Sequence, residues 1–115
     1  MNLRASTMVG LSLLWAIPSG PGAALAADAK ELFVASKCMK CHSIESQGVA
    51  AKPKAGEEDE VHDLSKVGAE RTADWIQKFL RKQADIEGKK HKLKFRGSDA
   101  DLETLATWLA SLGKQ

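Results

Sequence analysis

The most regular hydrophobic pattern lies near the C-terminus. Its apolar residues recur every three or four positions, at Leu102, Leu105, Ala106, Leu109 and Leu112. This spacing places them on one face of a helix. We expect Ser98 to be the N-cap, with Asp101 at the capping-box position, and Gly113 to end the helix.

Two shorter helical patterns precede it. Residues 73–82 follow Thr72, an expected N-cap, and carry a compact apolar stripe made of Trp75, Ile76, Phe79 and Leu80. A first helix is predicted from about Asp28 through Lys40, and its apolar patch consists of Leu32, Phe33 and Ala35. Three to four helices are therefore expected.

The segments between these helices lack periodicity. Residues 43–60 contain Gly48, Pro53 and Gly56 followed by an acidic run, and we expect a loop there. Residues 88–97 form a basic connector before the last helix. No alternating strand pattern appears, so the predicted fold class is all-α.

The first 26 residues have the pattern of a secretory signal peptide. Arg4 precedes an apolar run over residues 8–17, and Ala24-Leu25-Ala26 is typical of a cleavage site. We expect cleavage after Ala26, which leaves residues 27–115 as one domain in the periplasm. A retained N-terminal anchor is the alternative, but the run is shorter than the about 20 apolar residues that span a bilayer.

The charge of the chain is nearly balanced. Seventeen basic and 15 acidic residues give a formal net charge of +2, and loss of the signal peptide removes Arg4 and no acidic residue. Nucleic-acid binding would favour a strongly basic domain, so the composition gives it no support.

The chemistry is concentrated in Cys38-Met39-Lys40-Cys41-His42, which holds both cysteines of the chain. C-x-x-C-H is the attachment signature of c-type haem. Residues three apart lie on one face of a helical turn, so both thiols can reach the two vinyl groups along one porphyrin edge. His42 follows directly and is the expected proximal iron ligand.

Other chemistries use the same residues. Cys38 and Cys41 could form a disulfide, or a thioredoxin-like redox pair, although the βαβ context of that motif is absent. Zinc could take both cysteines with His62 and His91, but these histidines are 29 residues apart, unlike the short spacing of zinc fingers.

The chain resembles the class I cytochromes c of the small bacterial monohaem type. The resemblance rests on Phe33 before the pentad, on Asp63-Leu64-Ser65 with Val67-Gly68, on Asp74-Trp75-Ile76, and on residues 97–112. It implies that the first and last helices cross near Phe33 and Trp108 around one covalent haem c. It also implies one-electron transfer between larger redox partners.

One element of that family's pattern is missing. Such cytochromes usually bind iron through a methionine before the last helix, but this chain has only Met1, Met8 and Met39. Met39 lies inside the attachment motif, on the proximal side. His91 occupies the segment of the usual methionine and is the expected distal ligand. Lys92, His62 and an open position are the alternatives.

His62 and His91 have different expected environments. His62 stands where the family usually has a proline whose carbonyl hydrogen-bonds the proximal imidazole, and His62 can keep that contact. We expect its ring to lie in solvent. His91 is surrounded by lysines, whose positive charge disfavours protonation of its imidazole and so favours iron binding.

These residues predict a periplasmic, low-potential electron carrier with His42 and His91 as iron ligands. The alternative is a haem-based ligand-binding or sensor protein with an open or weakly held distal site. No enzyme active site is expected, although the chain could deliver electrons within a larger oxidoreductase.

The expected partners are transient redox proteins that dock at Lys89, Lys90, Lys92 and Lys94, with Lys78, Arg81 and Lys82 as possible extensions. A monomer without a stable membrane span is expected.

Overall fold

The computed structural model describes residue 10 and residues 21–114. Most of the expected signal peptide, including Arg4 and the apolar run, lies outside these residues. Among the described helices, none has the length and apolar character needed to cross a membrane. Cleavage after Ala26 stays a prediction.

The first helix, α1, spans Pro21–Ala35 and differs from the expected range at both ends. The expectation that it begins near Asp28 was wrong, because proline is tolerated in a first turn and the following alanines favour helix. It also ends before the cysteine motif. Lys37 adopts a left-handed conformation with φ of 60°, and a separate 3-10 helix, η1, covers Cys38–Lys40.

The two later helices lie where the hydrophobic pattern predicted them. Helix α3 spans Ala73–Leu80, two residues shorter than expected, and the Thr72 hydroxyl accepts a hydrogen bond from the Trp75 N–H at 3.2 Å. Helix α4 spans Asp99–Ser111, and the Ser98 hydroxyl accepts from the Asp101 N–H at 3.1 Å. Both N-caps are those expected.

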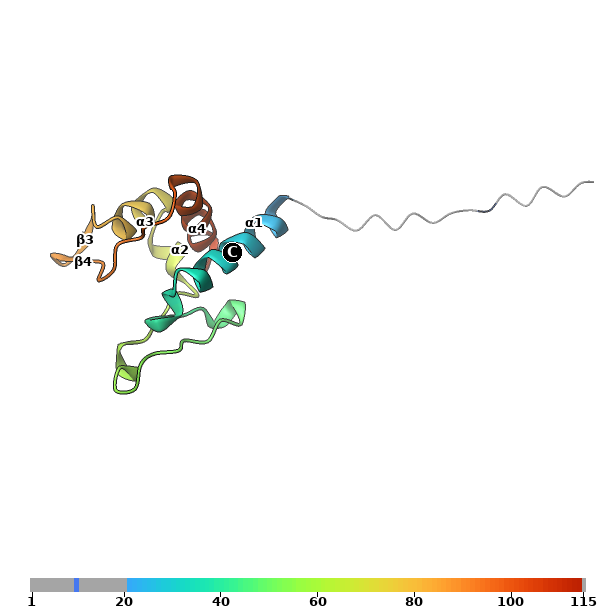
Figure 1. Ribbon diagram of the computed structural model, residues 1–115. Coiled ribbons are helices and arrows are strands. Elements are labelled where there is room, and N and C mark those ends of the chain that lie inside the picture. Colours follow the sequence, from blue (N-terminus) through green and yellow to red (C-terminus); the bar gives the residue numbers. More distant parts are fainter. Residues whose placement is uncertain (1–9, 11–20, 115) are drawn as a thin grey trace, which may run out of the picture.

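The core forms where α1 and α4 cross (Figure 1). Phe33 and Trp108 meet edge to face, with ring centroids 6.3 Å apart and planes at 75°. Both side chains are buried, together with Ala29, Leu105 and Leu109. The crossing therefore lies at the position that the resemblance implied.

A short fourth helix, α2 at Val67–Glu70, packs against the C-terminal end of α4. Gly68 makes this approach possible, since a Cβ there would lie 2.0 Å from the Ala110 carbonyl oxygen. The sequence pattern did not predict this helix, which is only four residues long.

Four two-residue strands complete the fold. Strands β1 (His42–Ser43) and β2 (His62–Asp63) pair in parallel, while β3 (Asp85–Ile86) and β4 (Lys89–Lys90) form an antiparallel hairpin. The expected loop over residues 43–60 also contains the 3-10 helices η2 (Glu45–Gln47) and η3 (Glu58–Glu60). The predicted all-α class is confirmed, with only these small strand pieces.

Substitution of Gly68 by alanine should destabilise the protein by about 3 kcal/mol, because the new methyl group meets backbone and not a flexible side chain. The measurement is denaturant unfolding of the holoprotein. Ala69→Ser at the exposed neighbouring position is the matched control and should change stability by less than about 0.5 kcal/mol. Equal effects of the two substitutions would contradict the packing of α2 on α4.

Candidate functional site

The cysteine motif forms a tight turn that aligns its two thiols. Helix η1 has about three residues per turn, so side chains at positions i and i+3 nearly eclipse one another. The Cys41 N–H donates to the Cys38 carbonyl oxygen at 3.2 Å, which closes this turn. Both cysteines are free thiols and half-buried. The turn thus presents two thiols on one side, as attachment to a porphyrin edge requires.

His42 leaves this turn on β1, where its ring is oriented by the neighbouring strand. His42 and His62 are register partners, and the His62 N–H donates to the Cys41 carbonyl oxygen at 2.9 Å. In return, His42 Nδ1–H donates to the His62 carbonyl oxygen at 3.2 Å. The carbonyl contact expected from His62 is therefore present. Because Nδ1 carries the proton, Nε2 of neutral His42 has a free lone pair.

Asp63 fixes this pair of strands in place. Its Oδ1 accepts hydrogen bonds from the Glu45 N–H at 3.1 Å, and from the Ser65 hydroxyl and N–H at 2.8 and 3.2 Å. The Ser43 hydroxyl is a further, longer donor at 3.4 Å. The Glu45 N–H is the main cause that lowers the pKa of Asp63 below its ordinary value. Asp63 therefore ties β2 to the residues that directly follow His42.

His91 follows β4, and its ring lies near that of His42. The two imidazole planes are nearly parallel, at 12°, and their ring centroids are 6.2 Å apart. His91 Nδ1–H donates to the Leu93 carbonyl oxygen, so its Nε2 also has a free lone pair when the ring is neutral. The Phe79 ring meets the His91 ring at 70° with 5.2 Å between centroids.

This spacing fits one metal ion held between two imidazoles. A metal–nitrogen bond of about 2.0–2.1 Å, extended by roughly 1.1 Å to the ring centre, places two opposed imidazole centres roughly 6.3 Å apart. Ligating histidines commonly donate their other ring N–H to a carbonyl group, as both rings do here. His42 and His91 thus have the distance and the hydrogen bonds of an iron-binding pair.

His62 is at a similar distance from His42 but in a different relation to it. The His42 and His62 centroids are 6.2 Å apart and their planes are tilted by 43°. The backbone of His62 lies on the Nδ1 side of His42, where its carbonyl accepts the ring proton. The His62 side chain is exposed, as expected. The contribution of His62 that the structure shows is thus its backbone carbonyl, which orients the His42 ring.

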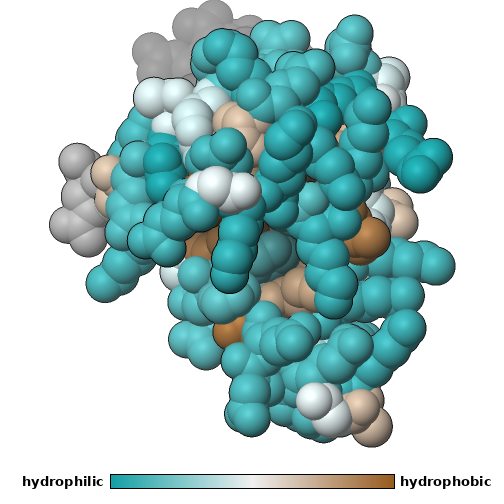
Figure 2. All heavy atoms as spheres, turned by 90° about the vertical axis from the view of Figure 1, so that its left-hand side faces the viewer, coloured by the Kyte–Doolittle hydropathy of each residue, from teal (hydrophilic) through white to brown (hydrophobic). Residues whose placement is uncertain are grey.

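Several apolar side chains pack on the core and are only partly buried. They include Met39, Leu64, Val67, Trp75, Leu80 and Phe95. Figure 2 looks onto the side of the molecule that carries the β3–β4 hairpin. That face is largely hydrophilic but hollowed near its middle, where hydrophobic residues are visible. An apolar plate such as a porphyrin suits such surroundings.

The pKa shift of Cys38 and the arrangement of the possible metal ligands argue against a redox-active thiol pair and a zinc site. Burial raises the pKa of the Cys38 thiol to about 11, whereas redox-active C-x-x-C thiols have lowered values. Burial also lowers the pKa of His42 and so favours the neutral ring, although the hydrogen bond to the His62 carbonyl opposes this shift. Among the described residues, no group of three or more Cys, His, Asp or Glu side chains is arranged to hold a metal. The alternative zinc set of Cys38, Cys41, His62 and His91 is thus not assembled there.

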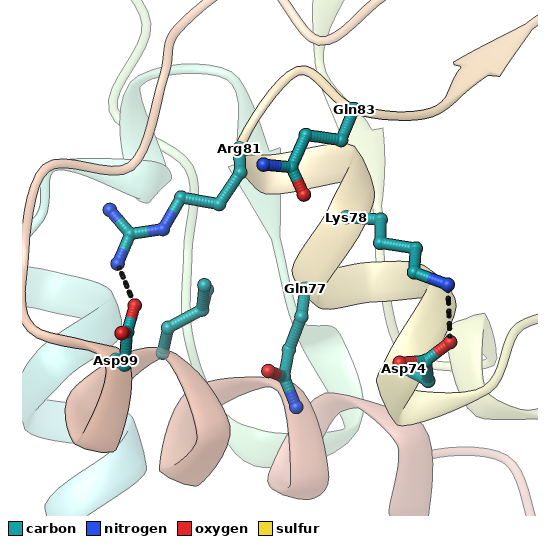
Figure 3. Close-up of a pocket in the computed structure, with 7 residues that line it drawn as sticks. Asp74, Gln77, Lys78, Arg81, Gln83 and Asp99 are labelled. Atoms are coloured by element: carbon teal, nitrogen blue, oxygen red, sulfur yellow. Dashed lines mark hydrogen bonds and ion pairs between the residues drawn. The ribbon is translucent and has the colours of Figure 1, made fainter.

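Two cavities in the described part of the chain lie away from the cysteines and histidines. A cavity of about 280 Å³ between α3 and α4 is lined by paired charges, with Lys78 2.9 Å from Asp74 and Arg81 2.9 Å from Asp99 (Figure 3). A second hollow of about 380 Å³ lies between α1 and α4. Neither is lined by the cysteines or by the histidines. Neither therefore extends the site.

Sequence reasoning missed the contacts that Phe79 and Arg81 make with the segment that carries His91. Phe79 was assigned to the buried stripe of α3, but it stacks on Trp75 at 4.7 Å and also contacts His91. Arg81 was considered as a docking charge, yet its side chain is only 19% exposed and its guanidinium is hydrogen-bonded within the fold. No local pattern indicated either role, because both depend on a segment more than ten residues away.

Comparison with known proteins identifies the family. A family model described as Cytochrome c matches residues 26–113. The chain therefore belongs to the cytochrome c family, as a class I c-type cytochrome. This family carries covalent haem c, and Cys38 and Cys41 fit its attachment motif. No curated protein matches the chain, and no solved structure matches it.

Replacement of both cysteines by alanine should leave haem that is bound without covalent bonds. We expect acid acetone to extract haem from the Cys38→Ala/Cys41→Ala variant but not from the wild-type protein, because thioether bonds survive this treatment. The measurement is the haem absorbance left in the precipitated protein. Ser36→Ala, just before the motif, is the control and should retain its haem; extraction from wild type would contradict the attachment.

Proposed function

We propose that this member of the cytochrome c family is a low-potential, one-electron carrier in the periplasm, with His42 and His91 as the two axial ligands of a single haem c. The observation that carries the proposal is the pair of parallel imidazoles 6.2 Å apart. Each has Nδ1 hydrogen-bonded to a backbone carbonyl and Nε2 free.

The residues of the chain have separate roles in this proposal. Cys38 and Cys41 tether the haem through thioethers, and His42 binds the iron from the same segment. The bound haem supplies a reversible change between ferric and ferrous iron. The carbonyl contacts of both histidines orient the rings and make the imidazoles better donors.

The low potential follows from the ligand set. Methionine ligation raises a haem potential, whereas a second imidazole favours ferric iron. Met39 is the one methionine after Ala26, and it belongs to η1 between the two cysteines. Its carbonyl oxygen accepts from the Lys52 N–H at 2.7 Å, and its side chain packs on the core. These contacts support its placement on the proximal side, away from His91.

The periplasmic location rests on the expected signal peptide and on the site of haem attachment in bacteria. The match of the family model begins at residue 26, beside the expected cleavage position. A carrier released there as a monomer would meet its redox partners by diffusion.

We infer that these partners dock at the four lysines Lys89, Lys90, Lys92 and Lys94, all of which are exposed. They lie on β4 and just after it, on the same segment as His91. Lys78 is paired with Asp74, and Arg81 is engaged inside the fold, so neither adds a free charge to this surface. The lysines would steer an acidic partner toward the haem.

A ligand-binding or sensor protein is the second candidate. The observation that favours it is the exposure of the segment that carries His91, where the Leu93 side chain is 59% exposed. A distal ligand on such a segment could leave the iron and make way for carbon monoxide or nitric oxide. Rapid binding of carbon monoxide by the ferrous wild-type protein would favour this function over electron transfer.

The ligand assignment predicts a low-spin, six-coordinate ferric spectrum without the far-red methionine–iron band. His91→Ala should become high-spin, and His91→Met should raise the reduction potential, because a thioether replaces an imidazole. Absorption and EPR spectra with a redox titration measure both effects.

His62→Ala is the matched control, since it removes the second nearby imidazole and keeps the backbone carbonyl that orients His42. Its spectrum should stay low-spin. A high-spin wild-type spectrum, or an unchanged potential in His91→Met, would show that His91 does not bind the iron.

The docking surface predicts an electrostatic contribution to electron transfer. Oxidation of the ferrous protein by hexacyanoferrate(III), an anionic oxidant, should slow as ionic strength rises, because salt screens attraction to the lysines. Replacement of the four lysines by glutamine should lower the rate at low salt several-fold and flatten its salt dependence. Lys114→Gln, near the C-terminus, should have little effect; equal effects would contradict docking at the four lysines.

A further inference from the structure

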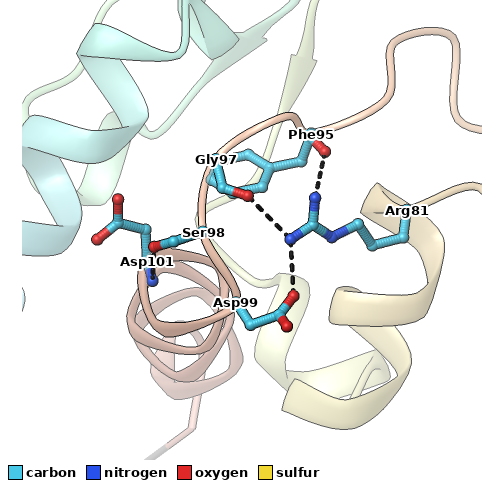
Figure 4. A network of polar contacts seen from close by, with 6 residues as sticks. All are labelled: Arg81, Phe95, Gly97, Ser98, Asp99 and Asp101. Carbon is cyan, nitrogen blue, oxygen red and sulfur yellow. Dashed lines mark hydrogen bonds and ion pairs between the residues drawn. The ribbon is translucent and has the colours of Figure 1, made fainter.

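The Arg81 side chain binds three acceptors at the start of α4 (Figure 4). Its Nη1 donates to the Phe95 carbonyl oxygen at 2.8 Å. Its Nη2 donates to the Gly97 carbonyl oxygen and to Asp99 Oδ1, each at 2.9 Å. Only 19% of the side chain is exposed. Hydrogen bonds from a charged donor are stronger than neutral ones, so this set, which we call the Arg81 clasp, is a firm attachment.

The Arg81 clasp closes a loop of the chain. Arg81 follows the last residue of α3, and Asp99 is the first residue of α4, so the clasp joins the two ends of the segment between these helices. The Phe95 N–H also donates to the Leu80 carbonyl oxygen at 2.8 Å. The Phe95 ring lies 5.5 Å from the Arg81 guanidinium, in cation–π range. The base of the loop is therefore held by several contacts.

His91 lies inside this loop, where few other contacts hold the chain. The residues after it, Lys92, Leu93 and Lys94, are exposed, and the four residues of β3 and β4 are exposed as well. Segments with little burial open at low free-energy cost. Within the loop, His91 is held by its hydrogen bond to the Leu93 carbonyl and by the adjacent β3–β4 pairing, both of which move with the loop. Besides the neighbouring Phe79 and His42 rings, the closure of the base of the loop therefore positions His91 relative to the rest of the fold.

We propose that Arg81 is a positioning residue for the distal ligand and sets the fraction of molecules in which His91 is bound to iron. This inference rests on the proposed ligation by His91. A loop closed at its base keeps the imidazole at high effective concentration beside the iron. Loss of the clasp lengthens the free segment, lowers that concentration and leaves the iron open more of the time.

The identity of the side chain matters for this role. The planar guanidinium has several donors in a fixed fork and reaches two carbonyls and a carboxylate together. A lysine ammonium would keep the charge but not this fork. Arg81→Lys should therefore keep part of the effect, between wild type and Arg81→Ala.

The test is equilibrium binding of carbon monoxide to the ferrous holoprotein, since carbon monoxide competes with His91 for the iron. The apparent affinity of a ligand scales with the fraction of molecules that can bind it. In Arg81→Ala we expect the fraction of molecules whose iron is not bound by His91 to rise about ten-fold. The apparent affinity for carbon monoxide should then rise about ten-fold as well. Arg81→Lys should show a smaller rise.

Two controls separate positioning from a general loss of stability. Lys78→Ala lies on the same helix and removes an exposed ion pair with Asp74, so the carbon monoxide affinity should not change. Gly68→Ala destabilises the packing of α2 on α4, away from the loop, and should also leave this affinity unchanged. An affinity gain in Gly68→Ala equal to that in Arg81→Ala would overturn the proposal.

The same measurement on His91→Ala distinguishes a failure of the role of Arg81 from a failure of ligation by His91. If His91→Ala binds carbon monoxide more tightly than wild type but Arg81→Ala does not, the role of Arg81 is wrong and ligation by His91 stands. If His91→Ala and wild type bind equally, ligation by His91 is wrong, and the role of Arg81 fails with it.

Should Arg81→Ala fail to retain haem, Arg81→Lys and Asp99→Ala decide the question. The Asp99 side chain is fully exposed, so its truncation removes one acceptor of the clasp without opening the core. Each variant should raise the apparent affinity about two- to three-fold. Wild-type affinity in both would overturn the proposal.

Discussion

The near-parallel placement of two imidazoles is the interaction on which the proposed site depends. His42 and His91 are 49 positions apart in the chain, yet their rings are nearly parallel with centroids 6.2 Å apart. Each ring uses Nδ1–H in a hydrogen bond to a carbonyl and leaves Nε2 free. One iron atom between them would join the two halves of the molecule, and the small domain would gain an apolar plate to pack around.

The two sides of this pair are built in different ways. On the proximal side, the cysteines, His42, the β1–β2 pairing and the Asp63 hydrogen bonds lie close together and restrain one another. On the distal side, His91 sits on an exposed loop that is held mainly at its base. With the proposed ligation by His42 and His91, the first ligand would be fixed and the second adjustable, so changes far from the iron could alter its ligation.

The helices supply the frame for both sides. The crossing of α1 and α4 at Phe33 and Trp108 positions the turn that carries the cysteines. Helix α3 packs on α4 and presents Phe79 to His91. The same helix leads into Arg81, so one element both supports the distal ring and anchors its loop.

The sequence by itself determined what depends on neighbouring residues: the cysteine motif, the caps at Thr72 and Ser98, the buried face of α4 and the all-α class. It did not predict where α1 begins, because an alanine-rich segment extends this helix toward the N-terminus. It also did not predict the short strands, because two-residue strands have no periodicity. Only the tertiary structure decided that the His91 ring lies parallel to that of His42, that Phe79 contacts His91 and that Arg81 closes the loop that carries His91. These contacts join residues distant in sequence, and their geometry depends on how the helices pack.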